Sequence, residues 1–168
     1  MKNLLVAFKK HSKKDMKIIL VNINMERIKQ IQEQIANHLG IEVLPIKYQN
    51  IEPDDSRLYA KEGFVAINEK YTNNELETIK SIAHEYRHAF QIYYASLMKD
   101  KLSQIWREEL AVAKTGEDSG YLGQALELDA FAFTKWYLAK YLGIEIVHPD
   151  AEYERVIQAY LARYEGIM

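Results

Sequence analysis

Residues 79–92 read IKSIAHEYRHAFQI. Apolar residues flank His84 and His88 on both sides, so the sequence predicts that both histidines lie in the middle of one long helix. Four residues of an α-helix turn through about 400°, so the two imidazole rings project from nearly the same side, one turn apart. This spacing lets both rings reach a single metal ion at about 2.0–2.1 Å.

Glu85 directly follows the first histidine and lies on the flank of the same helix face. It is rotated by about 100° from His84 and by about 60° from His88, so it does not point straight at the ion. A carboxylate in that position can take a proton from a water molecule activated by a metal. The motif therefore predicts a hydrolytic site with two histidine ligands and Glu85 as general base. The alternative, that the histidines only pack or cap, is disfavoured because burying these groups without partners is costly.

A third protein ligand must come from His, Asp or Glu, because the chain has no cysteine. Two acids, Glu127 and Asp129, occur in an otherwise apolar helical segment. We predict Glu127 as the third ligand, because it shares a helix face with Gly123, which permits close approach of another helix. Asp129 points about 200° away and is the alternative ligand. Either acid could instead form a structural ion pair, and Arg87 or Arg107 could pair with Asp129.

The pattern along the chain predicts an α+β fold in one domain spanning residues 1–168. A small N-terminal sheet precedes a helical C-terminal half. The predicted strands cover residues 17–21, 41–48 and 63–68, with Pro45 indicating an edge or a bulge and residues 53–56 forming a turn-rich link. The predicted helices cover residues 25–39, 74–98, 103–113 and 121–142, and a last one follows Pro149.

Composition narrows the classes of function. The formal net charge of −2 gives no basic excess, so we expect no nucleic-acid partner. Residues 1–15 form a basic lead-in whose apolar run is too short for a signal peptide, and no stretch approaches the length of a membrane span. Absence of cysteine fits a cytoplasmic protein. The sequence does not indicate the oligomeric state.

Three segments together resemble the zincin metallopeptidases: the strand GFVAIN at 63–68, the helix with HEYRH at 84–88, and a helix with ELDAFAF at 127–133. The resemblance is nearest to the glutamate-liganded group and the ImmA/IrrE-type family. It covers roughly residues 58–142. It implies a zincin-like fold with Zn²⁺ on His84, His88 and Glu127, Glu85 as general base, and a cytoplasmic peptidase acting on a peptide or protein. It also implies that strand 63–68 is an edge strand that pairs with extended substrate, whereas the residues by themselves fit an ordinary sheet strand equally well.

The chain departs from that family at Phe131, where Asn or Asp often orients a ligating histidine. A donor that stabilises the transition state is also expected, and the sequence does not choose among five candidates: Tyr59, Tyr71, Tyr121, Tyr137 and His148. The competing hypothesis is a zincin-like domain that works as a binding or regulatory module. Phe131 favours that hypothesis, whereas the intact Glu85 argues against it, since a purely structural metal site has no use for a base.

Overall fold

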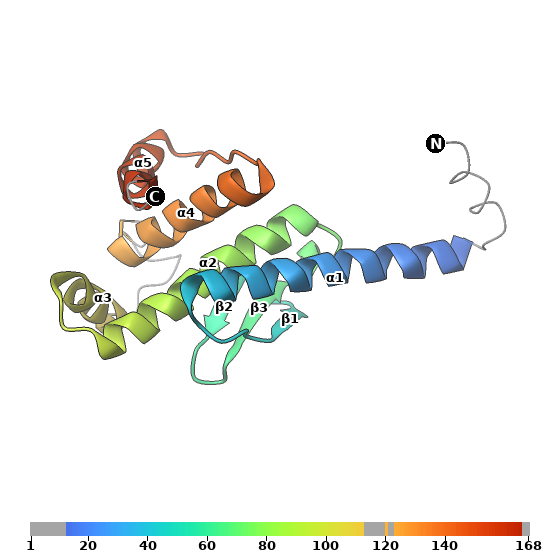
Figure 1. The fold of residues 1–168 in the computed structure, drawn as a ribbon, viewed down its shortest axis with the longest axis horizontal. Helices are drawn as coiled ribbons and strands as arrows, with labels where there is room; N and C mark the ends of the chain where they lie inside the picture. Colours follow the sequence, from blue (N-terminus) through green and yellow to red (C-terminus); the bar gives the residue numbers. More distant parts are fainter. Residues whose placement is uncertain (1–12, 113–119, 121–122, 166–168) are drawn as a thin grey trace.

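The computed structural model describes residues 13–112, 120 and 123–165, and it has the predicted α+β architecture (Figure 1). A small mixed sheet lies against a set of helices. In chain order the elements are α1 (Lys13–Leu39), β1 (Ile46–Gln49), β2 (Ser56–Tyr59), β3 (Phe64–Asn68), the 3₁₀-helix η2 (Glu69–Tyr71), α2 (Glu75–Leu97), α3 (Lys101–Val112), α4 (Ala125–Tyr137), the π-helical turn η3 (Leu138–Leu142) and α5 (Ala151–Glu165).

Helix α2 lies in the middle of the molecule, with the sheet on one side and α4 on the other (Figure 1). The sequence predicts Asn73 or Asn74 as the residue that caps this helix, and the cap is Asn74, whose side chain accepts a hydrogen bond from the backbone N–H of Glu77 at 3.2 Å. Its buried residues Ile79, Ile82 and Tyr86 belong to the same apolar core as residues of α1 and β3. The opposite side of α2 faces α4 and carries the histidine pair.

The sheet corrects one prediction about the strand at 63–68. The strand order is β1-β3-β2, with β1 parallel and β2 antiparallel to β3, so β3 is the central strand and not an edge strand. Its residues 65–67 are all fully buried, as is typical of an interior strand covered on both faces. The two outer strands are β1 and β2, and β2 begins at Ser56, inside the segment predicted to be only a link.

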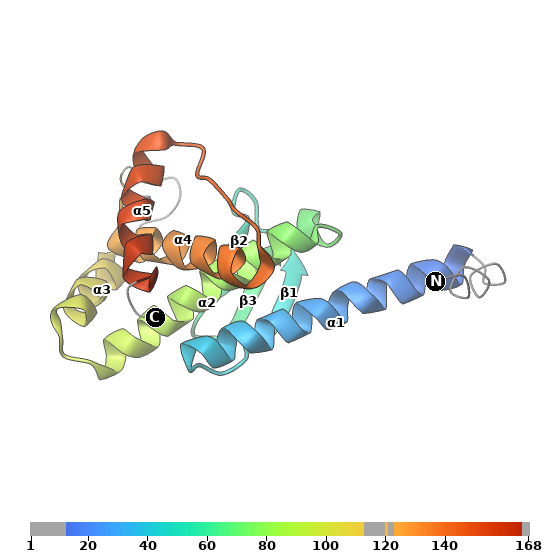
Figure 2. The same ribbon diagram turned by 45° about the horizontal axis from the view of Figure 1, so that its top comes forward.

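The strand predicted at residues 17–21 is wrong, because these residues belong to helix α1. No glycine or proline occurs between residues 13 and 39, so nothing interrupts the helix once it has formed. Gly40 ends it as predicted, with a φ of 66° and a hydrogen bond from the Ile41 N–H to the Ala36 carbonyl at 3.1 Å. The start of α1 projects beyond the body of the molecule (Figures 1 and 2). Residues 1–12 of the basic lead-in lie outside the described residues.

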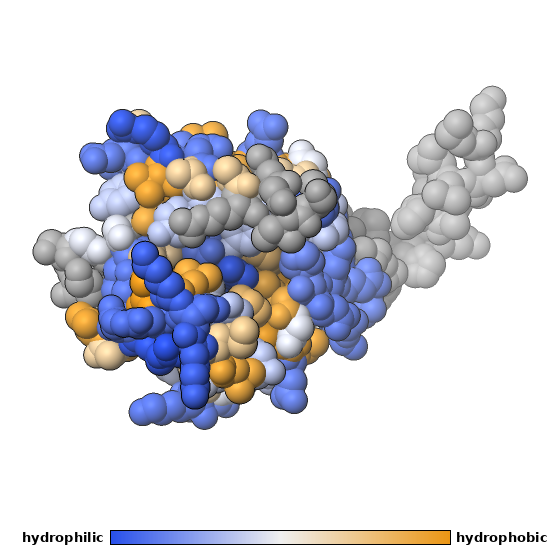
Figure 3. Space-filling model, turned by 60° about the vertical axis from the view of Figure 1, so that its left-hand side comes forward, coloured by the Kyte–Doolittle hydropathy of each residue, from blue (hydrophilic) through white to orange (hydrophobic). Residues whose placement is uncertain are grey.

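Helix α4 begins at Ala125, later than the predicted start at residue 121. The Glu109 carboxylate of α3 fixes this start, accepting from the N–H groups of Ala125 at 2.8 Å and Leu126 at 2.9 Å. The helical path continues through η3 until Gly143, which has a φ of 66°. On the side of the molecule that α3 occupies, apolar side chains are scattered among polar ones (Figure 3). No helix in the described part of the chain is both long and apolar enough to cross a membrane.

Candidate metal centre

Three side chains from two helices converge at the contact between α2 and α4. Nε2 of His84 lies 3.1 Å from Nε2 of His88, and the carboxylate of Glu127 lies 3.2 Å from the first and 3.3 Å from the second. All three potential ligand atoms lie within 4.8 Å of one another. Each side chain is at most 17% exposed, so the group is largely shielded from water. This is the geometry of a site that can hold one cation.

The donor chemistry of the group fits a metal ion. Oε2 of Glu127 is buried and finds no hydrogen-bond partner among the described residues, although Nε2 of His84 lies 3.2 Å away. A carboxylate oxygen and two imidazole nitrogens that face one another can all offer lone pairs, so a metal ion between them would satisfy all three at once. Two nitrogens and one oxygen form a donor set of the kind that transition metals, zinc among them, accept from proteins.

The pKa values of these groups reflect their mutual contact. Burial by itself lowers the pKa of His88, but the hydrogen bond and the charge of Glu127, with the charge of Glu85, outweigh it and raise that pKa to about 9. For Glu127, burial raises the pKa, but the two imidazoles lower it further, well below the usual range of a glutamate. A proton on His88 therefore satisfies the carboxylate when no metal is bound.

Glu85 lies beside the three-residue group and is not part of it. Its side chain is buried, and its Oε1 accepts a hydrogen bond from the Ser56 hydroxyl at 2.7 Å. Ser56 is the first residue of the outer strand β2 and lies twenty-nine residues earlier in the sequence. The sheet thus holds the carboxylate that the sequence predicted as general base. No local pattern points to Ser56, because the contact exists only once the sheet has packed on α2.

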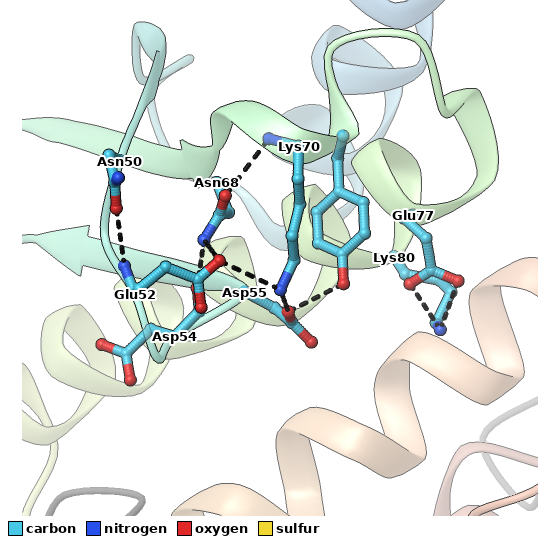
Figure 4. Close-up of polar contacts among 9 residues, drawn as sticks. Asn50, Glu52, Asp54, Asp55, Asn68, Lys70, Glu77 and Lys80 are labelled. Carbon is cyan, nitrogen blue, oxygen red and sulfur yellow. Dashed lines mark hydrogen bonds and ion pairs between the residues drawn. The ribbon is translucent and has the colours of Figure 1, made fainter.

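The loop before Ser56 is fixed by a network of polar contacts (Figure 4). The buried Asn68 side chain, at the end of β3, donates to the Glu52 carboxylate at 3.1 Å and to the Asp54 carbonyl at 2.9 Å. Lys70 reaches the Asp55 carboxylate at 2.8 Å. These contacts from β3 and η2 fix the chain immediately before β2, and therefore the position of the serine hydroxyl.

Asp129, the alternative ligand, does not join the group. Its carboxylate pairs with Arg87, with Nε of the arginine 2.7 Å from Oδ2, and both side chains are about nine-tenths buried. The Tyr164 hydroxyl donates to Oδ1 at 2.7 Å. Arg107, the other predicted partner of Asp129, instead donates to the Ala95 carbonyl at 2.6 Å, near the end of α2. The two acids of α4 thus have separate partners.

Two side chains contact the histidine rings from outside the group. Phe131 packs against His84, with ring centroids 4.8 Å apart. Gln91 lies 2.8 Å from Nδ1 of His88 and is fully buried. Gln91 was not among the residues that the sequence predicted at the site. The sequence feature that could have pointed to it is a polar side chain about one turn after His88, between the apolar residues Phe90 and Ile92.

The candidate transition-state donors differ in the partners that they contact in the structure. Tyr137 is buried and donates to Gln34 at 2.7 Å, and Tyr71 donates to Asp55 at 2.7 Å, so both hydroxyls are already engaged. Tyr59 stacks on Phe64, with ring centroids 4.7 Å apart. Tyr121 lies outside the described residues. His148 contacts Phe131 with ring centroids 5.5 Å apart, and is linked to His84 only through that ring.

Comparison of the chain with protein-family models, with curated proteins and with solved structures finds no match in any of the three.

Proposed function

We propose that this chain is a zinc-dependent peptidase that hydrolyses a peptide or protein substrate, as the sequence resemblance to zincins implies. The observation that carries the proposal is the convergence of His84, His88 and Glu127, with Glu85 buried beside them. A purely structural metal site is normally closed by four protein ligands, whereas three ligands and an adjacent carboxylate are the composition of a catalytic zinc site. Two imidazoles and one carboxylate suit zinc well.

In this proposal His84, His88 and Glu127 hold the ion, and Glu85 acts as the general base. A zinc ion held by these residues would supply Lewis acidity, which lowers the pKa of water to about 7. The Glu85 carboxylate accepts the proton of the attacking water and passes it to the leaving amine. The Ser56 hydroxyl holds one carboxylate oxygen at 2.7 Å, and the other oxygen is the one that would accept from the water. Burial of Glu85 keeps this proton transfer away from bulk solvent.

The outer strand β2 is the proposed binding edge for the substrate. It pairs with β3 on one side, and no described strand pairs with its other side, which we propose binds an extended peptide. Because Ser56 in β2 contacts Glu85, a peptide paired with this strand would pass close to the general base. This assignment replaces the strand at 63–68, which is hydrogen-bonded on both sides and has no free edge.

The substitution Glu85→Gln tests the proposed chemistry, because it removes the charge and keeps the shape. We expect it to retain zinc and to lose hydrolysis by about 10²–10⁴-fold. Glu77→Gln is a matched control on the same helix, since Glu77 pairs with Lys80 away from the site. Cleavage of a synthetic peptide mixture, followed by mass spectrometry on zinc-loaded protein, is the measurement. Equal cleavage by wild type and Glu85→Gln, or no cleavage by zinc-loaded wild type, would contradict the peptidase proposal.

A further inference from the structure

Gln91 forms a bridge between the metal-binding face of α2 and the first turn of α4. Its side chain is fully buried. The amide nitrogen Nε2 donates to the Leu126 carbonyl at 2.9 Å and to Oδ2 of Asp129 at 2.8 Å. The amide oxygen Oε1 lies 2.8 Å from Nδ1 of His88. All the hydrogen-bonding atoms of this amide are therefore engaged, on two helices.

The partners on α4 fix which way the amide points. A backbone carbonyl can only accept a hydrogen bond, and the Asp129 carboxylate, held by Arg87, also accepts. The NH₂ group of Gln91 must therefore face α4, and its oxygen must face His88. An amide oxygen can only accept, so Nδ1 of His88 must carry a hydrogen. In a neutral imidazole the other nitrogen, Nε2, then has the free lone pair.

We propose that Gln91 is a positioning residue, which holds His88 in the tautomer that presents the Nε2 lone pair to the metal. Nε2 of His88 is the atom that faces His84 and Glu127. A ligating histidine usually donates its second ring N–H to a carboxylate, a carbonyl or water, which fixes the ring and raises its basicity as a ligand. In this chain the acceptor for the second ring N–H of His88 is Oε1 of Gln91. This inference rests on the proposed metal site and assigns a new residue to it.

Asp129 extends this chain of contacts away from the site. Its Oδ2 accepts from both Gln91 and Arg87, and its Oδ1 accepts from Tyr164 on α5. Rotating the Gln91 amide by half a turn would place its oxygen against the Leu126 carbonyl and the Asp129 carboxylate, where no donor remains for it. The orientation of His88 therefore depends on how α4 and α5 pack on α2. Asp129 thus supports the ligand through Gln91 and is not a ligand itself.

The first test compares Gln91→Met with Gln32→Met. Gln32 is a matched control, because it is also a buried glutamine whose amide donates to a backbone carbonyl, that of Leu44, and to a side chain, that of Tyr86. Zinc affinity is measured by competition with a chromophoric chelator. We expect Gln91→Met to bind zinc about 10–100-fold more weakly than wild type, and Gln32→Met to bind as wild type does. Equal weakening in both variants, or none in Gln91→Met, would overturn the inference.

The second test needs no substitution, so it decides the case even if Gln91→Met does not fold. Wild-type protein with ¹⁵N-labelled histidine is loaded with ¹¹³Cd, and the metal–nitrogen coupling identifies the ligating atom. We expect coupling to Nε2 of His88 and a hydrogen retained on Nδ1. Coupling to Nδ1 would overturn the inference while leaving the metal site intact. Failure of wild type to bind either zinc or cadmium would instead contradict the proposed function, and the inference with it.

Discussion

The hydroxyl of Ser56 donates a hydrogen bond to the carboxylate of Glu85 at 2.7 Å, joining the outer strand β2 to the helix that carries the histidine pair. A buried carboxylate is costly without donors, so this contact stabilises the fold as well as the geometry of the site. It also ties the proposed general base to the strand that we propose binds substrate. A shift of β2 would therefore also move the donor that holds the Glu85 carboxylate on α2.

The substitution Ser56→Ala is expected to lower the free energy of unfolding by about 1–3 kcal/mol, because it leaves the Glu85 carboxylate without this donor. Ser96→Ala is the matched control, since the exposed Ser96 only donates to the Tyr93 carbonyl within α2, and it should change stability by less than about 0.5 kcal/mol. Urea unfolding of the metal-free proteins measures both values. Equal stability of the two variants would contradict the structural part assigned to Ser56.

The buried pair of Arg87 and Asp129 predicts a large effect of Asp129→Asn. Removing the charge leaves the guanidinium, on a side chain that is 11% exposed, without its carboxylate, and we expect a loss of about 3–5 kcal/mol in the free energy of unfolding. Asp54→Asn is a control that breaks the more exposed pair with Arg57, and should cost at most about 1 kcal/mol. Chemical denaturation checks both. A cost for Asp129→Asn as small as that of the control would show that the pair is not part of the core.

The contact between Glu154 and Lys135 predicts how stability changes in acid. Burial raises the Glu154 pKa, but hydrogen bonds from Lys135, from the His148 N–H and from Gln158 lower it to about 2, below the ordinary value of 4.5. Because the folded pKa lies below the unfolded one, this stabilisation is complete above about pH 4.5 and is lost as the pH falls toward about 2.

We therefore expect Glu154→Gln to be less stable than wild type by roughly 1–3 kcal/mol at pH 6, and the gap to narrow toward pH 2. Glu152→Gln, an exposed position in the first turn of the same helix, should behave like wild type at both pH values. Denaturant midpoints across this range give the comparison. A gap that stayed constant with pH would mean that the Glu154 charge does not hold α5 in place.

The part of the site that lies on one helix could be predicted from sequence. Helical periodicity, the Asn74 cap and the spacing of His84 and His88 are local, and the structure has them as expected. Glu127 was predicted as a ligand for a reason that is wrong, namely that Gly123 on the same helix face permits close approach of another helix. Gly123 lies in a turn before α4, and an added Cβ there would only make an ordinary contact at 3.6 Å. Glu127 faces the histidines because α4 starts at Ala125 and packs on α2.

The rest of the site depends on contacts between elements that are distant in sequence. A short apolar run such as 17–21 is compatible with either a strand or a helix. In the structure it is helical, because it belongs to the uninterrupted helix α1. Strand order likewise cannot be derived from the pattern at 63–68, since a central strand and an edge strand can carry the same apolar residues. Ser56 and Gln91 are polar residues of ordinary type, and their partners become visible only when β2 and α4 pack on α2.

Zinc content measured by mass spectrometry, after reconstitution and exhaustive dialysis, tests the central claim most directly. The wild-type chain should retain about one zinc ion, whereas His84→Ala and Glu127→Gln should retain almost none, because each loses one of three ligands. His38→Ala controls for the loss of a histidine elsewhere, since the exposed His38 packs on Trp136 at a ring distance of 4.9 Å. Equal zinc in wild type and in Glu127→Gln, or no zinc in wild type, would contradict the account.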